Sequence, residues 1–263
     1  MKKFIKESEI EKGISEGKRI GLNCFSPTSP FLKNLEIILR ILLKYYKKDD
    51  LMPTIFGVVH ELINFTHLNN MRYAFYKNTN LNTEEKDKDY FLKNEVDFLN
   101  SVSDYPKKFN YRDELLKKNM NILTVIEHNE NAIKVLVYNQ SKFHLNNESI
   151  LREYLKKAMN YNNVEDYYND HPEDPKGKGL GLAFSIILLK EAGLRPDLMR
   201  FGNQDSVMCS RIEIPFNSDY KSIRDRILND ESIVPFEKPN LIPPEFKEQF
   251  EKRKKELEKT LSK

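Results

Sequence analysis

The sequence has little cysteine and no tryptophan, and its apolar runs are short. Its two cysteines, Cys24 and Cys209, lie far apart, and no cysteine–histidine cluster has the spacing of a zinc site. That pattern excludes a disulfide scaffold and is typical of a reducing compartment. Residues 1–7 hold no apolar run of signal-peptide length, and no stretch approaches the roughly 20 apolar residues that cross a bilayer. We therefore expect a cytoplasmic protein with no membrane partner.

An excess of charge of one sign is also missing. The 43 basic and 40 acidic residues nearly cancel to a net charge of +3, so no global field indicates a nucleic-acid partner. The chain has 263 residues, 39% of them hydrophobic and 32% charged, which predicts one large or two small globular domains with a very polar surface.

Two long segments have helical periodicity. In residues 31–46 apolar side chains recur every three or four positions on one face, which predicts an amphipathic helix. Residues 53–77 are apolar on more than one side, which is typical of a helix sandwiched between a sheet and other helices. This second segment also carries an unusual set of polar side chains: His60, Glu61, Asn64, His67, Asn69 and Asn70.

Two hairpins are predicted further along the chain. Residues 122–127 and 132–139 flank a polar turn, and residues 199–201 and 207–215 form the second pair. A helix is expected over residues 148–160, and residues 161–175 are acidic and end in prolines, which indicates a mobile loop. The fold class we predict is an α/β two-layer sandwich, with helices covering a mostly antiparallel mixed sheet.

Composition divides the chain into three parts. Residues 1–30 form a mixed N-terminal segment, and residues 31–216 form the main domain, with an insertion or lid over about 78–120. Residues 217–263 form a tail in which an extended Pro-rich stretch precedes a charged helix. We expect this tail to pack on the body or to recruit a partner.

The most distinctive stretch is a glycine loop that leads into a helix, Lys176-Gly177-Lys178-Gly179-Leu180-Gly181-Leu182. Glycines at alternate positions let backbone amides approach a ligand closely, and a helix N-terminus attracts anions. Lys176 and Lys178 add positive charge. The loop therefore predicts a phosphate-bearing ligand, although its spacing is neither that of a P-loop nor that of a Rossmann fingerprint.

Three motifs within residues 30–216 resemble those of the ATP-binding domain of histidine kinases and their relatives, the GHKL or Bergerat-fold ATPases. His60-Glu61-Leu62-Ile63-Asn64 is similar to the N-box, and Val137-Tyr138-Asn139-Gln140-Ser141 stands where the family has a strand ending in Asp-x-Gly-x-Gly. Residues 176–193 resemble the glycine-rich G2 box. More narrowly, the chain resembles stand-alone kinase-like ATP-binding proteins of spirochaetes.

The resemblance implies a histidine-kinase-type ATP-binding fold and a set of site residues. ATP or ADP is the implied cofactor, and its implied contacts are Asn64, Asn139, Lys176, Gly177, Lys178, Gly179 and Gly181. Glu61 keeps the position of the base or water-orienting glutamate. Phe65 replaces the magnesium-binding asparagine, so Asn64 is the remaining candidate for magnesium. Asn139 is the candidate acceptor for adenine in place of the missing aspartate.

These departures favour a signal-transduction pseudoenzyme that binds nucleotide weakly or not at all and acts through protein partners. A first alternative is an active ATP-dependent histidine or protein kinase, or an ATPase, with a rearranged pocket and Glu61 as its catalytic residue. A second alternative is an adaptor that binds no nucleotide. His60-Glu61 with Asn64 also resembles a phosphoacceptor motif, in which residues 31–77 would form a dimerising hairpin and His60 would carry the phosphoryl group. A homodimer is compatible with each of these readings.

Overall fold

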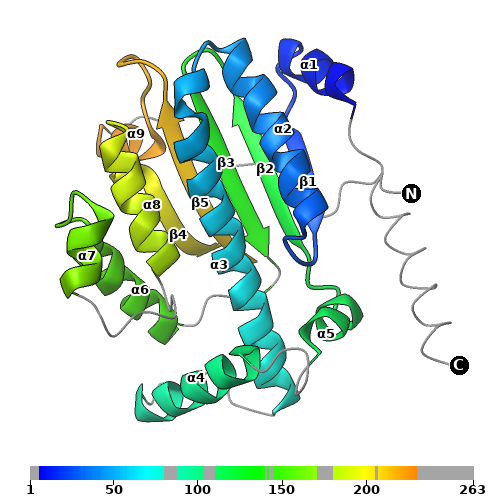
Figure 1. The fold of residues 1–263 in the computed structure, drawn as a ribbon, viewed down its shortest axis with the longest axis vertical. Helices are drawn as coiled ribbons and strands as arrows, with labels where there is room; N and C mark the ends of the chain where they lie inside the picture. The colour runs from blue at the N-terminus through cyan, green and yellow to red at the C-terminus, as the bar shows by residue number, and fades with distance from the viewer. Residues whose placement is uncertain are drawn as a thin grey trace, which may run out of the picture.

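The computed structural model describes residues 6–79, 88–103, 110–139, 141, 145–170, 180–204 and 207–229 (Figure 1). Along the described chain, groups of helices are separated by one single strand and two pairs of consecutive strands. Their bounds are α1 Glu7–Ser15, β1 Ile20–Cys24, α2 Ser29–Tyr45, η1 Asp49–Leu51, α3 Met52–Asn78, α4 Lys88–Ser103, α5 Tyr111–Lys117, β2 Ile122–His128, β3 Ala132–Asn139, α6 Leu145–Ala158, α7 Val164–Asp170, α8 Leu180–Glu191, η2 Pro196–Leu198, β4 Met199–Gln204, β5 Val207–Pro215 and α9 Ile223–Leu228.

The strands of the described chain form one five-stranded sheet in the order β1-β2-β3-β5-β4, with every neighbouring pair antiparallel. In the register of the three central strands, Thr124 lies opposite Val137, and Val137 lies opposite Ser210. Because side chains alternate between the two faces of a strand, these three residues share one face with Asn139. That face is the one covered by helices.

A layer of helices covers this face of the sheet. Figure 1 shows α2 and α3 lying across the strands and α8 beside α3. The buried stripe of α2 recurs at helical spacing, and α3 buries apolar side chains on several sides because the sheet, α2 and α8 surround it. The predicted two-layer α/β sandwich is confirmed at this level, and both predicted helices, 31–46 and 53–77, are present.

The far half of α3 carries a second, smaller core. Its members come from α3, α4 and α5 and include Met71, Ala74, Phe98, Tyr111 and Leu115. This core lies within and beside the predicted insertion, residues 78–120, whose described parts pack on the protruding end of α3 (Figure 1). The described part of this range is therefore a helical unit attached to the far end of α3.

An ion pair fastens α4 to α3. The Arg72 guanidinium donates to both carboxylate oxygens of Glu95, with Nε–Oε2 at 2.8 Å and Nη2–Oε1 at 2.7 Å. Tyr76 donates its hydroxyl to the same carboxylate at 3.1 Å, and Arg72 lies over the Phe98 ring. A bidentate, mostly buried pair of this kind has strict geometry, so it fixes the position of α4 on α3.

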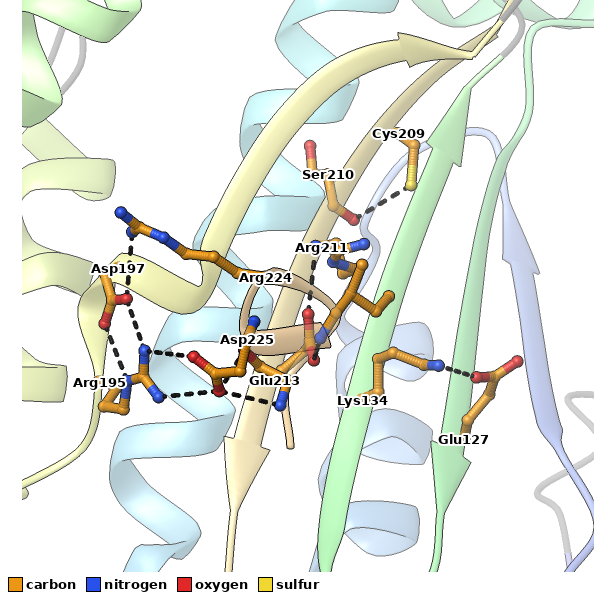
Figure 2. A network of polar contacts seen from close by, with 12 residues as sticks. Glu127, Lys134, Arg195, Asp197, Cys209, Ser210, Arg211, Glu213, Arg224 and Asp225 are labelled. Atoms are coloured by element: carbon orange, nitrogen blue, oxygen red, sulfur yellow. Dashed lines mark hydrogen bonds and ion pairs between the residues drawn. The ribbon is translucent and has the colours of Figure 1, made fainter. Parts of the chain in front are cut away.

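The opposite face of the sheet, which we call the outer face, has both apolar and charged residues. Leu123, Leu136 and Tyr138 form its apolar cluster, with Val125, Val207 and Cys209 packed against them. Figure 2 views this face, with the blue and cyan helices behind the strands and the side chains of Glu127, Lys134 and Arg211 among those in front. Lys134 pairs with Glu127 at 2.6 Å, and Arg211 pairs with Glu213 at 3.1 Å.

The N-terminal segment and the acidic loop are more ordered than the sequence predicts. Residues 1–30 contribute α1 and the edge strand β1, and residues 161–175, predicted as a mobile loop, contain α7. In β1 the apolar residues Ile20, Leu22 and Cys24 alternate with Gly21 and Asn23, but the run is short and these two residue types are depleted in strands. In α7 the side chain that joins the core is Tyr167, which is buried and packs edge-on against Tyr154 and Tyr161. The helix 244–263 predicted in the tail lies outside the described residues.

None of the described helices combines the length and the apolar character that a membrane-spanning helix needs.

Candidate functional site

The site residues gather where α3 passes the first turn of α8. A Cβ atom placed on Gly181 would lie 1.8 Å from Oε2 and 2.7 Å from Cδ of Glu61, so the Glu61 carboxyl group occupies the space beside this glycine. One turn earlier on α3, a Cβ on Gly57 would lie 3.3 Å from the Leu188 side chain. The two helices therefore approach closely, and their glycines allow it.

The contact joins two motifs that lie 120 residues apart in the sequence. Glu61 belongs to the N-box-like segment and Gly181 to the glycine loop, and both were predicted as site residues. A carboxylate at the first turn of a helix is favoured by the helix dipole. The Glu61 carboxyl group therefore lies where an anionic ligand of this helix end would also be attracted.

His60 and Asn64 lie on the same side of α3 as neighbours one turn apart. The Asn64 amide nitrogen lies 3.2 Å from His60 Nε2, and His60 Nδ1 lies 3.9 Å from Glu61 Oε1. The His60 ring also stacks on Phe56, with ring centroids 6.0 Å apart. Because the Asn64 amide nitrogen can only donate, His60 Nε2 is the acceptor in this arrangement. The phosphoacceptor role of His60 stays a prediction.

The residues around Asn64 do not fit a magnesium site. The ligands that Mg²⁺ prefers are oxygens, and it demands near-octahedral geometry. Here the Asn64 amide nitrogen contacts the His60 ring, so Asn64 could offer only its one amide oxygen, and the next residue, Phe65, supplies none and packs edge-on against Phe201 with centroids 5.2 Å apart. No cluster of three or more metal-ligating side chains occurs among the described residues. Asn64 is thus held as a partner of His60.

A buried polar cluster joins α3 to the end of β3. Ser141 Oγ accepts from Asn69 Nδ2 and from Asn139 Nδ2, each at 3.0 Å, and donates to Asn70 Oδ1 at 3.2 Å. Asn70 in turn donates to the Met120 carbonyl at 3.4 Å. All four side chains of this asparagine–serine cluster are at most 3% exposed. This buried hydrogen-bond network between α3 and β3 therefore accounts for two of the polar side chains of α3, Asn69 and Asn70.

One acceptor of the cluster remains without a partner. Because Asn139 uses its amide nitrogen for Ser141, its carbonyl oxygen is left over, and it is buried with no hydrogen-bond partner in the described structure. Thr124 Oγ1 and Ser210 Oγ lie on the two flanking strands and point to the same face, and they too are buried without a hydrogen-bond partner in the described structure. Buried polar atoms without partners are costly and rare. Ordered waters, or a donor group of a ligand that reached the strand end, would satisfy these acceptors.

The structure brings some predicted site residues together and leaves others out. Glu61 and Gly181 meet, and Asn139 lies under the same helix, α3, at the strand end. Asn64 is engaged by His60. Four predicted nucleotide contacts, Lys176, Gly177, Lys178 and Gly179, lie outside the described residues. Sequence reasoning missed Ser141 as the centre of the buried cluster, although it stands two residues after Asn139, a spacing that places both at one strand end.

His67 is a further polar residue of α3 and lies close to the N-terminal segment. Its Nε2 atom is 3.4 Å from Ser26 Oγ, and burial lowers the pKa of the ring to about 4. The neutral ring is therefore the form that the folded protein prefers. In the unfolded chain the pKa returns to about 6.5.

We expect His67 to make stability depend on pH. Because the folded-state pKa is lowered, its contribution is complete above about pH 6.5 and is lost as pH falls toward 4, where only the unfolded chain is protonated. The loss approaches about 3 kcal/mol over this range. Urea unfolding at several pH values checks this, with His67→Gln as the control. An equally steep loss in His67→Gln would assign the effect to other groups.

No protein-family model matches the chain, and no match was found among the curated proteins or the solved structures. The functional argument therefore rests on the residues and their geometry.

Proposed function

We propose that this chain is a signal-transduction or regulatory protein built on a histidine-kinase-type, Bergerat-type ATP-binding fold. Its pocket is degenerate: it binds ATP or ADP weakly, does not turn it over, and acts through contacts with protein partners. The observation that carries the proposal is the contact between Glu61 and Gly181. It joins the N-box-like helix to the glycine loop, as an ATP site of this kind requires.

The sheet supplies the second support. The Asn139 carbonyl oxygen is a buried acceptor without a partner, and the exocyclic amino group of adenine is a donor that would satisfy it. The loop lysines and the start of α8 would attract the phosphates. This arrangement favours an adenine nucleotide over a ligand that has only acceptors.

The degenerate character follows from the residues near Asn64. Phosphoryl transfer needs a metal ion to neutralise the charge that moves with the phosphoryl group. Because Phe65 packs on Phe201 and Asn64 contacts His60, this part of the site lacks the donor set for magnesium. Binding without turnover is therefore the function that these residues support.

Calorimetric titration with ATP and with ADP tests the proposal. We expect weak binding to the wild-type protein that magnesium does not strengthen. In Asn139→Ala the affinity should fall about tenfold, because one buried hydrogen bond to the base is lost. Asn217→Ala, which removes an exposed asparagine amide bonded to Asn131, is the matched control and should bind as the wild type does.

Two outcomes would overturn this proposal. Phosphate release that disappears in Glu61→Ala would show the alternative function, an active kinase or ATPase, which the retained position of Glu61 favours. Absence of any heat or thermal shift with either nucleotide would identify the chain as a nucleotide-independent adaptor. Gly179→Val tests the role of the glycine loop separately from that of Asn139. Unchanged nucleotide affinity in this variant would mean that the phosphates bind elsewhere.

A further inference from the structure

The apolar cluster of the outer face is covered. Leu123, Leu136 and Tyr138 keep only 2%, 2% and 3% of their surface exposed. They lie on adjacent strands in the register Leu123–Tyr138 and Val125–Leu136, and they point away from the layer that contains α2, α3 and α8. A single sheet face with water on it would leave such side chains far more accessible. Some segment of the same chain therefore lies over them.

The described elements leave this cover unassigned. The large helices pack on the other face, and α4 and α5 pack on the far end of α3. Of the described helices, α9 alone is held to the outer face. The Glu213 carboxylate accepts from the Tyr220 hydroxyl at 2.6 Å and from the Ile223 backbone amide at 3.1 Å. This contact fixes the position at which the chain leaves the body.

A capping box fixes the start of α9. Ser222 donates its hydroxyl to Asp225 at 2.7 Å, and the Asp225 amide donates back to Ser222 at 3.1 Å. Asp225 also pairs with Arg195, as Figure 2 shows. The last residue of α9 is Leu228, and 35 residues of the sequence follow it. The chain therefore enters this tail from the outer face.

We propose that the tail segment Ile233 to Ile242 packs against the outer face and covers the cluster of Leu123, Leu136 and Tyr138. Its sequence, Ile-Val-Pro-Phe-Glu-Lys-Pro-Asn-Leu-Ile, has apolar residues at both ends and begins five residues after Leu228. Five residues span up to about 17 Å, so the segment begins close to α9, whose first residue, Ile223, is bonded to Glu213 on the outer face. Proline suits an extended strap, because it has no amide donor to leave unpaired.

Charge complementarity supports this occupant. Arg200 and Arg211 lie directly opposite each other on β4 and β5, and like charges in that position repel. The tail brings Asp230, Glu231 and Glu237 next to its apolar residues. A second copy or another protein is a weaker candidate, because the cluster is already buried within one chain.

Native cysteines provide the test. Cys209 packs against the covered cluster, whereas Cys24 packs against the core on the helix side of the sheet. Burial raises the pKa of the Cys209 thiol to about 11 and that of the Cys24 thiol to about 12. Alkylation of each cysteine in the full chain is followed by mass spectrometry. We expect the double variant Val234→Asp/Phe236→Asp to speed alkylation of Cys209 at least tenfold and to leave Cys24 unchanged. The matched control is Phe250→Asp/Leu257→Asp, which should resemble the wild type.

An unchanged rate at Cys209 in Val234→Asp/Phe236→Asp would overturn the proposal, because the cover would then not depend on this segment. Faster alkylation of both cysteines would also overturn it, since it would indicate general unfolding.

Discussion

Gly181→Ala should destabilise the wild-type protein by about 1–2 kcal/mol and stabilise the Glu61→Ala protein by about 0.5 kcal/mol. In the wild type the new Cβ would fall 1.8 Å from Glu61 Oε2, so the carboxyl group must leave its place, at the cost typical of overpacking. When Glu61 is already alanine, that space is free. The substitution then only replaces a glycine by a better helix former.

The reversal of sign is measured with a double-mutant cycle from urea unfolding curves. The coupling between Glu61 and Gly181 should be about 2 kcal/mol. Gly13→Ala is the matched control, because Gly13 is also helical and a Cβ there meets nothing within 4 Å. It should have the same small effect whether residue 61 is glutamate or alanine. Additive effects of Glu61→Ala and Gly181→Ala would mean that the two residues are not in contact.

Loss of one partner of the Arg72–Glu95 pair should have the largest effect on stability. Glu95→Met leaves the Arg72 guanidinium largely buried, with 12% of its side chain exposed, and removes the acceptor of Tyr76. We expect a loss of about 3 kcal/mol. Arg72→Met/Glu95→Met should cost clearly less than Glu95→Met alone, because no unpaired charge remains.

Hydrogen exchange locates this effect. Amides of α4 and α5 should lose protection in Glu95→Met, whereas those of the central strands should change little, since the pair joins only α4 to α3. A surface pair gives the control: Glu36→Met, which frees Arg40 on α2, should change stability by less than about 1 kcal/mol. Equal losses in Glu95→Met and Glu36→Met would show that the Arg72–Glu95 pair adds little.

Periodicity predicted the parts of the fold that have a strong pattern. The helix at 31–46 and the strand at 132–139 were predicted because their apolar residues repeat regularly, and the structure contains both. The edge strand β1 was missed because its alternating run is only five residues long and contains Gly21 and Asn23, residue types that are depleted in strands. An edge strand is held by backbone hydrogen bonds to its one neighbouring strand, and the sequence of the edge strand does not show which segment that neighbour is.

The site was predicted less completely than the fold. Motif resemblance selected Glu61 and Gly181, and the structure places them in contact. It could not show that Asn64 is engaged by His60, since this depends on rotamers. Ser141 was not selected because its partners, Asn69 and Asn70, lie some 70 residues earlier in the chain. The sequence around a polar residue on a helix does not show which strand end that residue will contact in the folded protein.

One helix carries both the glutamate–glycine contact and the ion pair that holds α4. Glu61 and Arg72 are eleven residues apart on α3, which is close to three helical turns and a separation of about 16 Å. The two side chains therefore project from nearly the same side of a rigid rod. A shift of α3 along its axis would therefore change two contacts at once, the one between Glu61 and Gly181 at α8 and the Arg72–Glu95 pair at α4.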